Sequence, residues 1–278
     1  MTIEELIKSA LEEDIGDGDH TTLSTVPPQA RGKVKMIAKQ NGIVAGIEVA
    51  EKVFKAVDPG LKIEKYLTDG QPLKTSDVIM RIEGKSQSLL TAERTALNFI
   101  QRMSGIATYT RSLVNKLSGL NTRILDTRKT TPCNRIVEKM AVKAGGGENH
   151  RFGLYDMIMI KDNHIDFAGG IKQAIEATLK YLDENGKDLK IEIEVRNFDE
   201  LYQVLETGGV HRIMLDNFST GDLYTAVKMI DGKYETEASG GITESTIREY
   251  AETGVDFISV GALTHHIKSL DISLKADL

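Results

Sequence analysis

Hydrophobic and polar residues follow two patterns in the first hundred positions of the chain. Apolar positions at helical spacing predict an amphipathic helix over residues 2–13, and a turn rich in Gly, Asp and Thr follows it. Beyond this turn, apolar and polar residues alternate in short stretches bounded by Gly, Pro and Asp, a pattern typical of strands. These stretches cover residues 33–46, 61–70 and 77–84. A helix combined with several strands predicts an α+β domain over residues 1–105.

A long helical pattern comes next, over residues 88–117. Its apolar residues recur every three or four positions, with one interruption at Ser104-Gly105. We expect the interruption to mark a domain junction, so that a second domain covers residues 106–266.

Six short apolar runs alternate with helical stretches in this second domain. Strands that alternate with helices are typical of parallel βα units. Six strands are fewer than the eight of a complete barrel, so the pattern fits either an incomplete α/β barrel or an open doubly wound sheet. The runs are RILDT (123–127), YDMIMIKD (155–162), KIEIEV (190–195), HRIMLD (211–216), YETEASG (234–240) and DFISVG (256–261).

Composition excludes several classes of protein and of site. The chain has 278 residues and a formal net charge of −6, which argues against a general nucleic-acid or membrane-surface binder. No segment approaches the roughly 20 consecutive apolar residues of a membrane helix, and the acidic N-terminus is unlike a signal peptide. The single cysteine, Cys133, excludes an intramolecular disulfide and a cysteine-based zinc site. These features predict a cytoplasmic enzyme or binding protein.

Polar residues follow the carboxyl ends of these predicted strands, where parallel α/β folds bind their ligands. One group is basic, and arginine and lysine there suit a carboxylate or a phosphate. Isolated positions of this kind are usually helix caps or solvated surface charges, but their recurrence after several strands favours one composite site. The basic group consists of Arg128, Lys129, His150, Arg151 and Lys161.

A second group is acidic. Glu192 and Glu194 lie two residues apart on one predicted strand, so both side chains point to the same face, and Asp216 ends the next strand. Carboxylates at this edge suit a Mg²⁺ ion shared with substrate phosphates, and general acid–base catalysis is the competing use.

A third group is rich in glycine. Ser239, Gly240 and Gly241 end one βα unit, and Gly261 ends the next. The loops after the last two strands of a barrel often bind phosphate through backbone N–H groups, so we expect a phosphate site here.

Taken in order along the chain, these residues resemble the quinolinate phosphoribosyltransferase family over nearly the whole sequence. The resemblance rests on LDTRKTTP, GGGENHRFGLYDMIMIKDNH, IEIEV, IMLDNF and EASGGIT, and on EEDIGDGDHTT and ERTALNFIQRMSGIAT nearer the N-terminus. It implies an N-terminal α+β sandwich domain completed by the C-terminal tail, residues 267–278, and an irregular α/β barrel with fewer strands than usual.

The resemblance also implies an activity. This is the pentosyl transfer from phosphoribosyl pyrophosphate to quinolinate with decarboxylation, giving nicotinate mononucleotide, pyrophosphate and CO₂ in NAD biosynthesis. It further implies Mg²⁺ as the cofactor and a homodimer in which Arg102 reaches the neighbouring site. Two alternatives stay open: a relative acting on another heterocyclic acid, including the paralogue associated with molybdenum transport, and a non-catalytic ligand-binding module.

Residue roles follow from the resemblance position by position. Lys129, Lys161, Glu194 and Asp216 correspond to catalytic residues, and the two carboxylates also correspond to the metal edge. The substrate-binding set is Arg102, Arg128, Lys129, Thr130, His150, Arg151, Lys161, Glu194, Asp216, Ser239, Gly240, Gly241 and Gly261. One departure concerns the loop after Pro132, where the family commonly has Gly-Leu-Arg and this chain has Cys133-Asn134-Arg135. We expect Cys133 to be an inert free thiol.

Overall fold

The structure is a computed structural model that describes residues 1–277. Contacts between residues divide the chain into two compact units. The first, here called unit 1, comprises residues 1–112, 129–147 and 262–278, of which Leu278 lies outside the described residues; unit 2 comprises residues 113–128 and 148–261. The boundaries expected at residues 105 and 266 stay a prediction.

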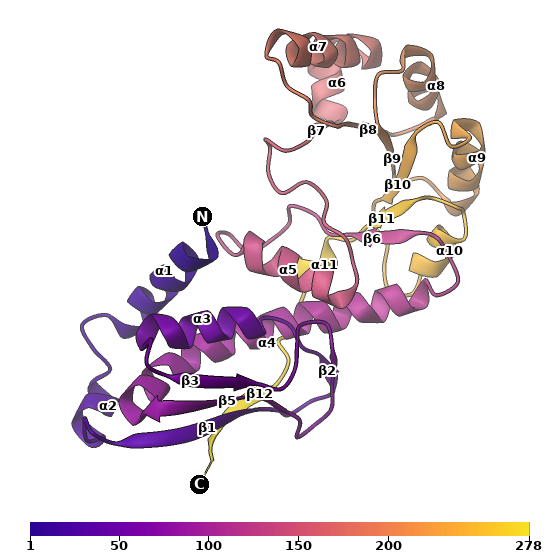
Figure 1. Ribbon diagram of the computed structural model, residues 1–278. Coiled ribbons are helices and arrows are strands. Elements are labelled where there is room, and N and C mark those ends of the chain that lie inside the picture. The colour runs from indigo at the N-terminus through magenta and orange to yellow at the C-terminus, as the bar shows by residue number, and fades with distance from the viewer. Residues whose placement is uncertain (278) are drawn as a thin grey trace. The chain divides into compact units, whose positions relative to one another are not determined.

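Unit 1 contains a four-stranded antiparallel sheet with the strand order β12-β1-β5-β3 (Figure 1). The C-terminal segment forms its edge, because Val34 to Ala38 of β1 pair with Ala276 to Ile272 of β12. The strands are β1 (Arg31–Ala38), β3 (Lys62–Lys65), β5 (Val78–Lys85) and β12 (Ile272–Ala276), and a separate two-stranded sheet joins β2 (Gly42–Ile43) to β4 (Pro72–Leu73).

Helix α1 (Ile3–Ile15) begins at a capping box. The hydroxyl of Thr2 accepts a hydrogen bond from Glu5 N, and the Glu5 carboxylate accepts one from Thr2 N, which satisfies two backbone donors at the helix start. The expected helix over residues 2–13 is therefore present and ends slightly later. The other helices of unit 1 are α2 (His20–Thr25), α3 (Ile47–Val57), α5 (Arg135–Gly145) and α11 (Ala262–His265).

Helix α4 (Ser86–Lys116) runs without a break through Ser104 and Gly105, where the apolar pattern is interrupted. Both residues serve packing. The hydroxyl of the buried Ser104 accepts a hydrogen bond from Ala45 N at 3.0 Å. At Gly105 the missing side chain lets the backbone of Lys268 and Ser269 lie directly against the helix.

Unit 2 contains all six predicted strands in one parallel sheet, with the order β6-β11-β10-β9-β8-β7 (Figure 1). Strands β7 to β11 are neighbours in sequence order, and β6 joins beside β11 as it would in a closing barrel. A doubly wound sheet would instead reverse its order at a switch point, so the incomplete barrel is confirmed. The strands are β6 (Arg123–Leu125), β7 (Ile158–Ile160), β8 (Ile191–Val195), β9 (Arg212–Asp216), β10 (Glu235–Ser239) and β11 (Phe257–Ser259).

Helices join successive strands of this sheet and contact one another in chain order. They are α6 (Asp162–Ala168), α7 (Ile171–Glu184), α8 (Phe198–Thr207), α9 (Thr220–Ile230) and α10 (Ile247–Ala251). Along β8, buried Ile191 and Ile193 alternate with Glu192 and Glu194, whereas β9 has the buried apolar run Ile213, Met214 and Leu215 between Arg212 and Asp216. Among residues 1–277, no helix has both the length and the apolar character needed to cross a membrane.

Candidate active site

Two arginines lie close together at the carboxyl edge of the unit 2 sheet. Arg128 follows β6, and Arg151 lies in the loop before β7. Burial lowers the pKa of Arg151, and the positive charge of Arg128 lowers it further, which shows that the two guanidinium groups repel each other. The Arg151 Nη1 donates to the carbonyl of Met157 at 3.2 Å, and the charges of Glu192 and Asp156 partly offset the lowering of its pKa. The pair is therefore suited to a ligand with more than one negative charge.

Lys161, Glu194 and Asp216 come together at the ends of three adjacent strands, β7, β8 and β9. Lys161 Nζ lies 3.4 Å from Glu194 Oε2. Burial raises the pKa of Glu194, Lys161 opposes this rise, and the nearby Asp216 adds to it. The Glu194 carboxylate thus lies between a lysine and a second carboxylate, an arrangement that also suits a bound cation.

The glycine-rich loop after β10 has the backbone freedom that a phosphate site needs. Gly240 and Gly241 have φ values of 98° and 61°. A Cβ at Gly240 would collide with the side chain of Asn217 and lie 2.9 Å from Asn217 N, whereas one at Gly241 would meet nothing within 4 Å. Asn217 N also donates to Ser239 O at 2.9 Å. The helix after this loop, α10, has five residues, so the loop backbone itself is the anion-binding surface on offer.

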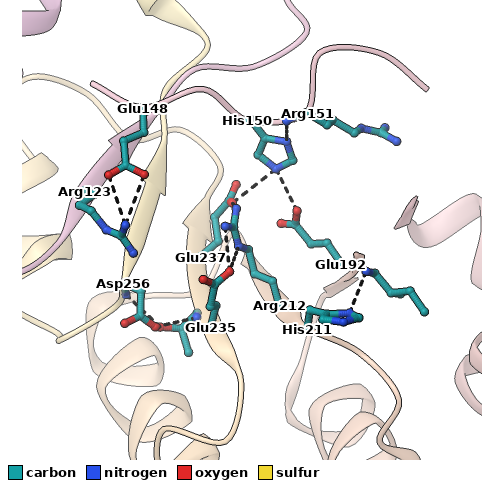
Figure 2. A network of polar contacts seen from close by, with 12 residues as sticks. Arg123, Glu148, His150, Arg151, Glu192, His211, Arg212, Glu235, Glu237 and Asp256 are labelled. Carbon is teal, nitrogen blue, oxygen red and sulfur yellow. Dashed lines mark hydrogen bonds and ion pairs between the residues drawn. The ribbon is translucent and has the colours of Figure 1, made fainter. Parts of the chain in front are cut away.

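His150 points into the interior of the sheet, between two buried glutamates (Figure 2). Its Nε2 lies 2.9 Å from Glu192 Oε2 and 3.5 Å from Glu237 Oε2. On its other side, Nδ1 accepts a hydrogen bond from Arg151 N at 2.7 Å. The His150 backbone N donates to the buried Asp126 carboxylate at 2.9 Å. The sequence pattern placed His150 in the basic substrate cluster, but both of its ring nitrogens face groups of this chain.

Two effects act on the protonation of His150. Burial lowers its pKa, but Glu192 and Glu237 raise it, and the resulting pKa is about 9. A cationic ring would carry a proton on Nδ1 and could not accept the Arg151 N–H, so that hydrogen bond opposes full protonation. In the cationic ring, and equally in a neutral ring whose Nδ1 accepts a hydrogen bond, Nε2 carries a proton at neutral pH.

The two glutamates beside His150 differ in their ionisation. Burial and the neighbouring charge of Glu237 raise the pKa of Glu192 to about 7. Burial also raises the pKa of Glu237, but His150, Ser259 and Arg212 outweigh it and hold that pKa below its usual value. Glu237 is therefore the more permanently charged partner.

Charged groups lie beneath these glutamates, with Arg212 between Glu237 and Glu235 (Figure 2). Arg212 Nη1 donates to Glu237 at 3.0 Å, and its Nε and Nη2 donate to Glu235 at 3.1 and 2.9 Å. The guanidinium carbons of Arg123 and Arg212 each lie 4.1 Å from the ring centroid of Phe257. These cation–π contacts hold both arginines close to the sheet.

Of the remaining predicted site residues, Gly261 follows β11 as the last residue of unit 2, and the other three belong to unit 1. Arg102 Nη2 lies 2.6 Å from Oε1 of the fully buried Glu138 and also donates to Thr131 and to Thr264 O. Lys129 O accepts a hydrogen bond from the Thr264 hydroxyl at 2.9 Å, and the Thr130 hydroxyl accepts one from Arg135 at 3.1 Å. Arg102 is thus held on unit 1 by a carboxylate that the sequence pattern did not single out.

Cys133 is exposed and has a φ of 65°. This left-handed conformation favours glycine, the residue that the family commonly has at this position. The departure noted in the sequence therefore places a side chain where the backbone is strained.

Sequence reasoning missed Asn217, Glu237 and Arg212. Two of them carry a signal that could have been used. Arg212 pairs with Glu192 across β8 and β9, and Glu237, which pairs with Met214 two residues further along, points to the same face of the sheet. A charged residue at a buried position of a central strand needs a partner of opposite charge. Asn217 follows Asp216 at the end of β9 and has a φ of 57°, a conformation that asparagine tolerates better than most residues.

Comparison with known families gives two matches that together span most of the chain. The family model described as "Quinolinate phosphoribosyl transferase, C-terminal domain" matches residues 106–275, and the corresponding N-terminal domain model matches residues 19–104.

Individual relatives match over nearly the full length of this chain. The chain is 46% identical to "Quinolinate phosphoribosyltransferase [decarboxylating] 1b" of Nicotiana tabacum over 98% of this chain and 81% of the relative. It is 41% identical to the "Probable nicotinate-nucleotide pyrophosphorylase [carboxylating]" of Bacillus subtilis, over 100% of this chain and 94% of the relative. The crystal structure of NadC from Streptococcus pyogenes matches with a TM-score of 0.93 and 39% identity, over 98% of this chain and 95% of that one.

Proposed function

Because the chain belongs to the quinolinate phosphoribosyltransferase family, we propose that it transfers the phosphoribosyl group of phosphoribosyl pyrophosphate to quinolinate. The pyridine nitrogen forms a bond to the anomeric carbon as the bond from that carbon to pyrophosphate breaks. The 2-carboxylate then leaves as CO₂, its bonding electrons are taken up by the cationic ring, and a proton replaces it. The observation that carries the proposal is the repelling pair Arg128 and Arg151, which suits the two carboxylates of quinolinate.

In this proposal the basic residues position the dicarboxylate rather than form a covalent bond to it. Arg128, Arg151 and Lys161 balance its two negative charges. Positioning and charge stabilisation supply most of the catalysis when both reactants come from solution, because the chain holds them in one geometry. Lys129 is proposed to neutralise the departing pyrophosphate, and Thr130 to contact the same substrate.

Glu194 and Asp216 have the chemistry to hold Mg²⁺ together with substrate oxygens. Mg²⁺ is typically held by one or two carboxylates and keeps several waters. The raised pKa of Glu194 next to Asp216 indicates a place where a cation is favoured. When bound, the ion would supply charge neutralisation for the pyrophosphate. Ser239, Gly240, Gly241 and Gly261 are the proposed cradle for the 5′-phosphate.

We also propose a homodimer in which Arg102 works in the partner's site, and a cytoplasmic location in keeping with the single cysteine. The dimer can be tested by mixing two inactive variants, Arg102→Ala and Arg151→Ala. If Arg102 acts across subunits, each mixed dimer regains one intact site, and an equal mixture recovers about a quarter of the wild-type activity. Recovery of no activity would place Arg102 in its own chain's site.

The activity is tested by supplying quinolinate, nicotinate and phosphoribosyl pyrophosphate separately and together with Mg²⁺. We expect CO₂ and pyrophosphate to form in equal amounts, and only with quinolinate plus phosphoribosyl pyrophosphate. Arg151→Ala should lose quinolinate binding in calorimetry with its fold intact, whereas Lys180→Ala, which removes an exposed cation on α7, should match the wild type. Release with nicotinate instead, or binding without turnover, would support the other heterocyclic acid or the binding module.

A further inference from the structure

We propose that Glu192 and Glu237 are positioning residues that hold Arg151 in place through the ring of His150. The inference rests on the proposed function, because it assigns Arg151 to quinolinate. The acidic group in the sequence included Glu192 without a role of its own, Glu237 was not singled out, and both side chains are fully buried.

The orientation of the His150 ring is set by contacts at both of its nitrogens. Its Nε2 faces Glu192 at 2.9 Å and Glu237 at 3.5 Å, and its Nδ1 faces Arg151 N at 2.7 Å. Neither oxygen of Glu192 has an aligned hydrogen-bond partner among residues 1–277, so its approach to Nε2 is an ion-pair contact. A rotation of the ring would break the hydrogen bond from Arg151 N and move Nε2 away from both buried carboxylates, which is unfavourable.

The His150 ring in turn fixes the backbone of Arg151. The hydrogen bond from Arg151 N to Nδ1 fixes the backbone from which the Arg151 side chain extends (Figure 2). Asp126 fixes the preceding amide by accepting from His150 N. The position of the guanidinium therefore depends on carboxylates that lie deeper in the sheet.

Glu237 is itself held in place by neighbouring groups. Glu237 is held by Arg212, which Glu235 and the ring of Phe257 also hold. The contacts from Arg212 to Arg151 thus pass through Glu237 and His150, whose side chains are both buried. Glu235 contacts Arg212 but is not one of the residues between Arg212 and Arg151. Residues that orient the groups in direct contact with a ligand commonly affect binding by tenfold or more.

A metal ion is the competing use of this cluster, because one ligand atom from each of His150, Glu192 and Glu237 lies within 4.8 Å of the others. Metal binding would require a lone pair on Nε2. The Nδ1 atom already accepts an N–H, so the ring proton is on Nε2 and that lone pair is absent. The geometry therefore favours positioning.

The decisive variants are Glu237→Gln and Glu235→Gln. Both remove a charge next to Arg212, but only Glu237 reaches His150. We expect Glu237→Gln to raise the KM for quinolinate at least about tenfold and to leave the KM for phosphoribosyl pyrophosphate within about twofold. Glu235→Gln should change neither. Equal effects of the two variants, or equal changes in both KM values, would overturn the inference.

A measurement on the wild-type chain covers the case in which Glu237→Gln fails to fold. With ¹⁵N-labelled histidine, and with His150→Gln for assignment, we expect a protonated Nε2 and an unprotonated Nδ1 at neutral pH. A protonated Nδ1, or an Nε2 signal that shifts stoichiometrically with added Zn²⁺, would refute it. Lack of CO₂ release by the wild type would refute the proposed function alone, since the histidine spectrum still tests the contacts.

Discussion

The close contact between α4 and the C-terminal segment predicts opposite effects for two glycine substitutions in helices. A Cβ at Gly105 would overlap Lys268 O and lie 3.1 Å from Ser269 Cα. Both neighbours are backbone, so the segment must move. Overpacking costs up to about 3 kcal/mol, and alanine recovers about 1 kcal/mol of helix propensity. We therefore expect Gly105→Ala to lower the free energy of unfolding by about 2 kcal/mol.

Gly221 provides the matched control. It lies in the first turn of α9, and a Cβ there would meet only Ser219 Oγ, at 3.9 Å. Gly221→Ala should therefore stabilise the chain by up to about 1 kcal/mol. Urea unfolding followed by circular dichroism measures both changes, and hydrogen exchange of β12 should rise in Gly105→Ala alone. If both variants are stabilised equally, the contact between α4 and the C-terminal segment is not as close as described.

Three further substitutions or conditions test particular features. Cys133→Gly should stabilise the chain by about 0.5–1 kcal/mol in urea unfolding, because it relieves a left-handed residue, whereas a similar gain from Cys133→Ala would argue against strain. Thr122→Val should lower the free energy of unfolding by about 1–2 kcal/mol in the same assay, since the buried Thr122 hydroxyl donates to Val255 O at 2.6 Å. An unchanged free energy of unfolding would mean that water satisfies the Val255 carbonyl in the variant. The hydrogen bond from Lys35, and the charges of Lys35 and Arg81, lower the pKa of Asp277 below 3.8, so its contribution is present above pH 3.8 and is lost as pH falls through the lowered value. Amide exchange of β12 should accordingly rise at low pH, and Asp277→Asn should abolish that dependence.

The alternation of strands and helices was enough to predict the fold of unit 2. All six runs are strands because each combines β-branched or apolar residues with turn residues at its ends. The helix over residues 88–117 was also predicted, but not its continuity. A Ser-Gly pair normally weakens a helix, and here Ser104 and Gly105 are explained by segments distant in sequence, around Ala45 and Lys268. Contacts of that kind leave no local pattern.

The carboxyl edge of the sheet was predictable for a related reason. Parallel strands bring their ends to one edge, so Lys161, Glu194 and Asp216 had to lie near one another once the strands were known. The direction of the His150 side chain could not be derived in this way. It lies in a loop, and loop residues have no register that fixes which groups they face.

Strand register also explains why the charges divide into two layers. Glu194 lies one inward position closer to the carboxyl end of β8 than Glu192, and the two carboxylates contact different partners. The outer carboxylate contacts Lys161 and the inner one contacts His150, and both are buried. Because a single strand supplies both layers, a shift of register by one residue would remove both at once. The alternation along β8 that forms the sheet therefore also sets the positions of Glu194, in the proposed catalytic site, and of Glu192, in its proposed support.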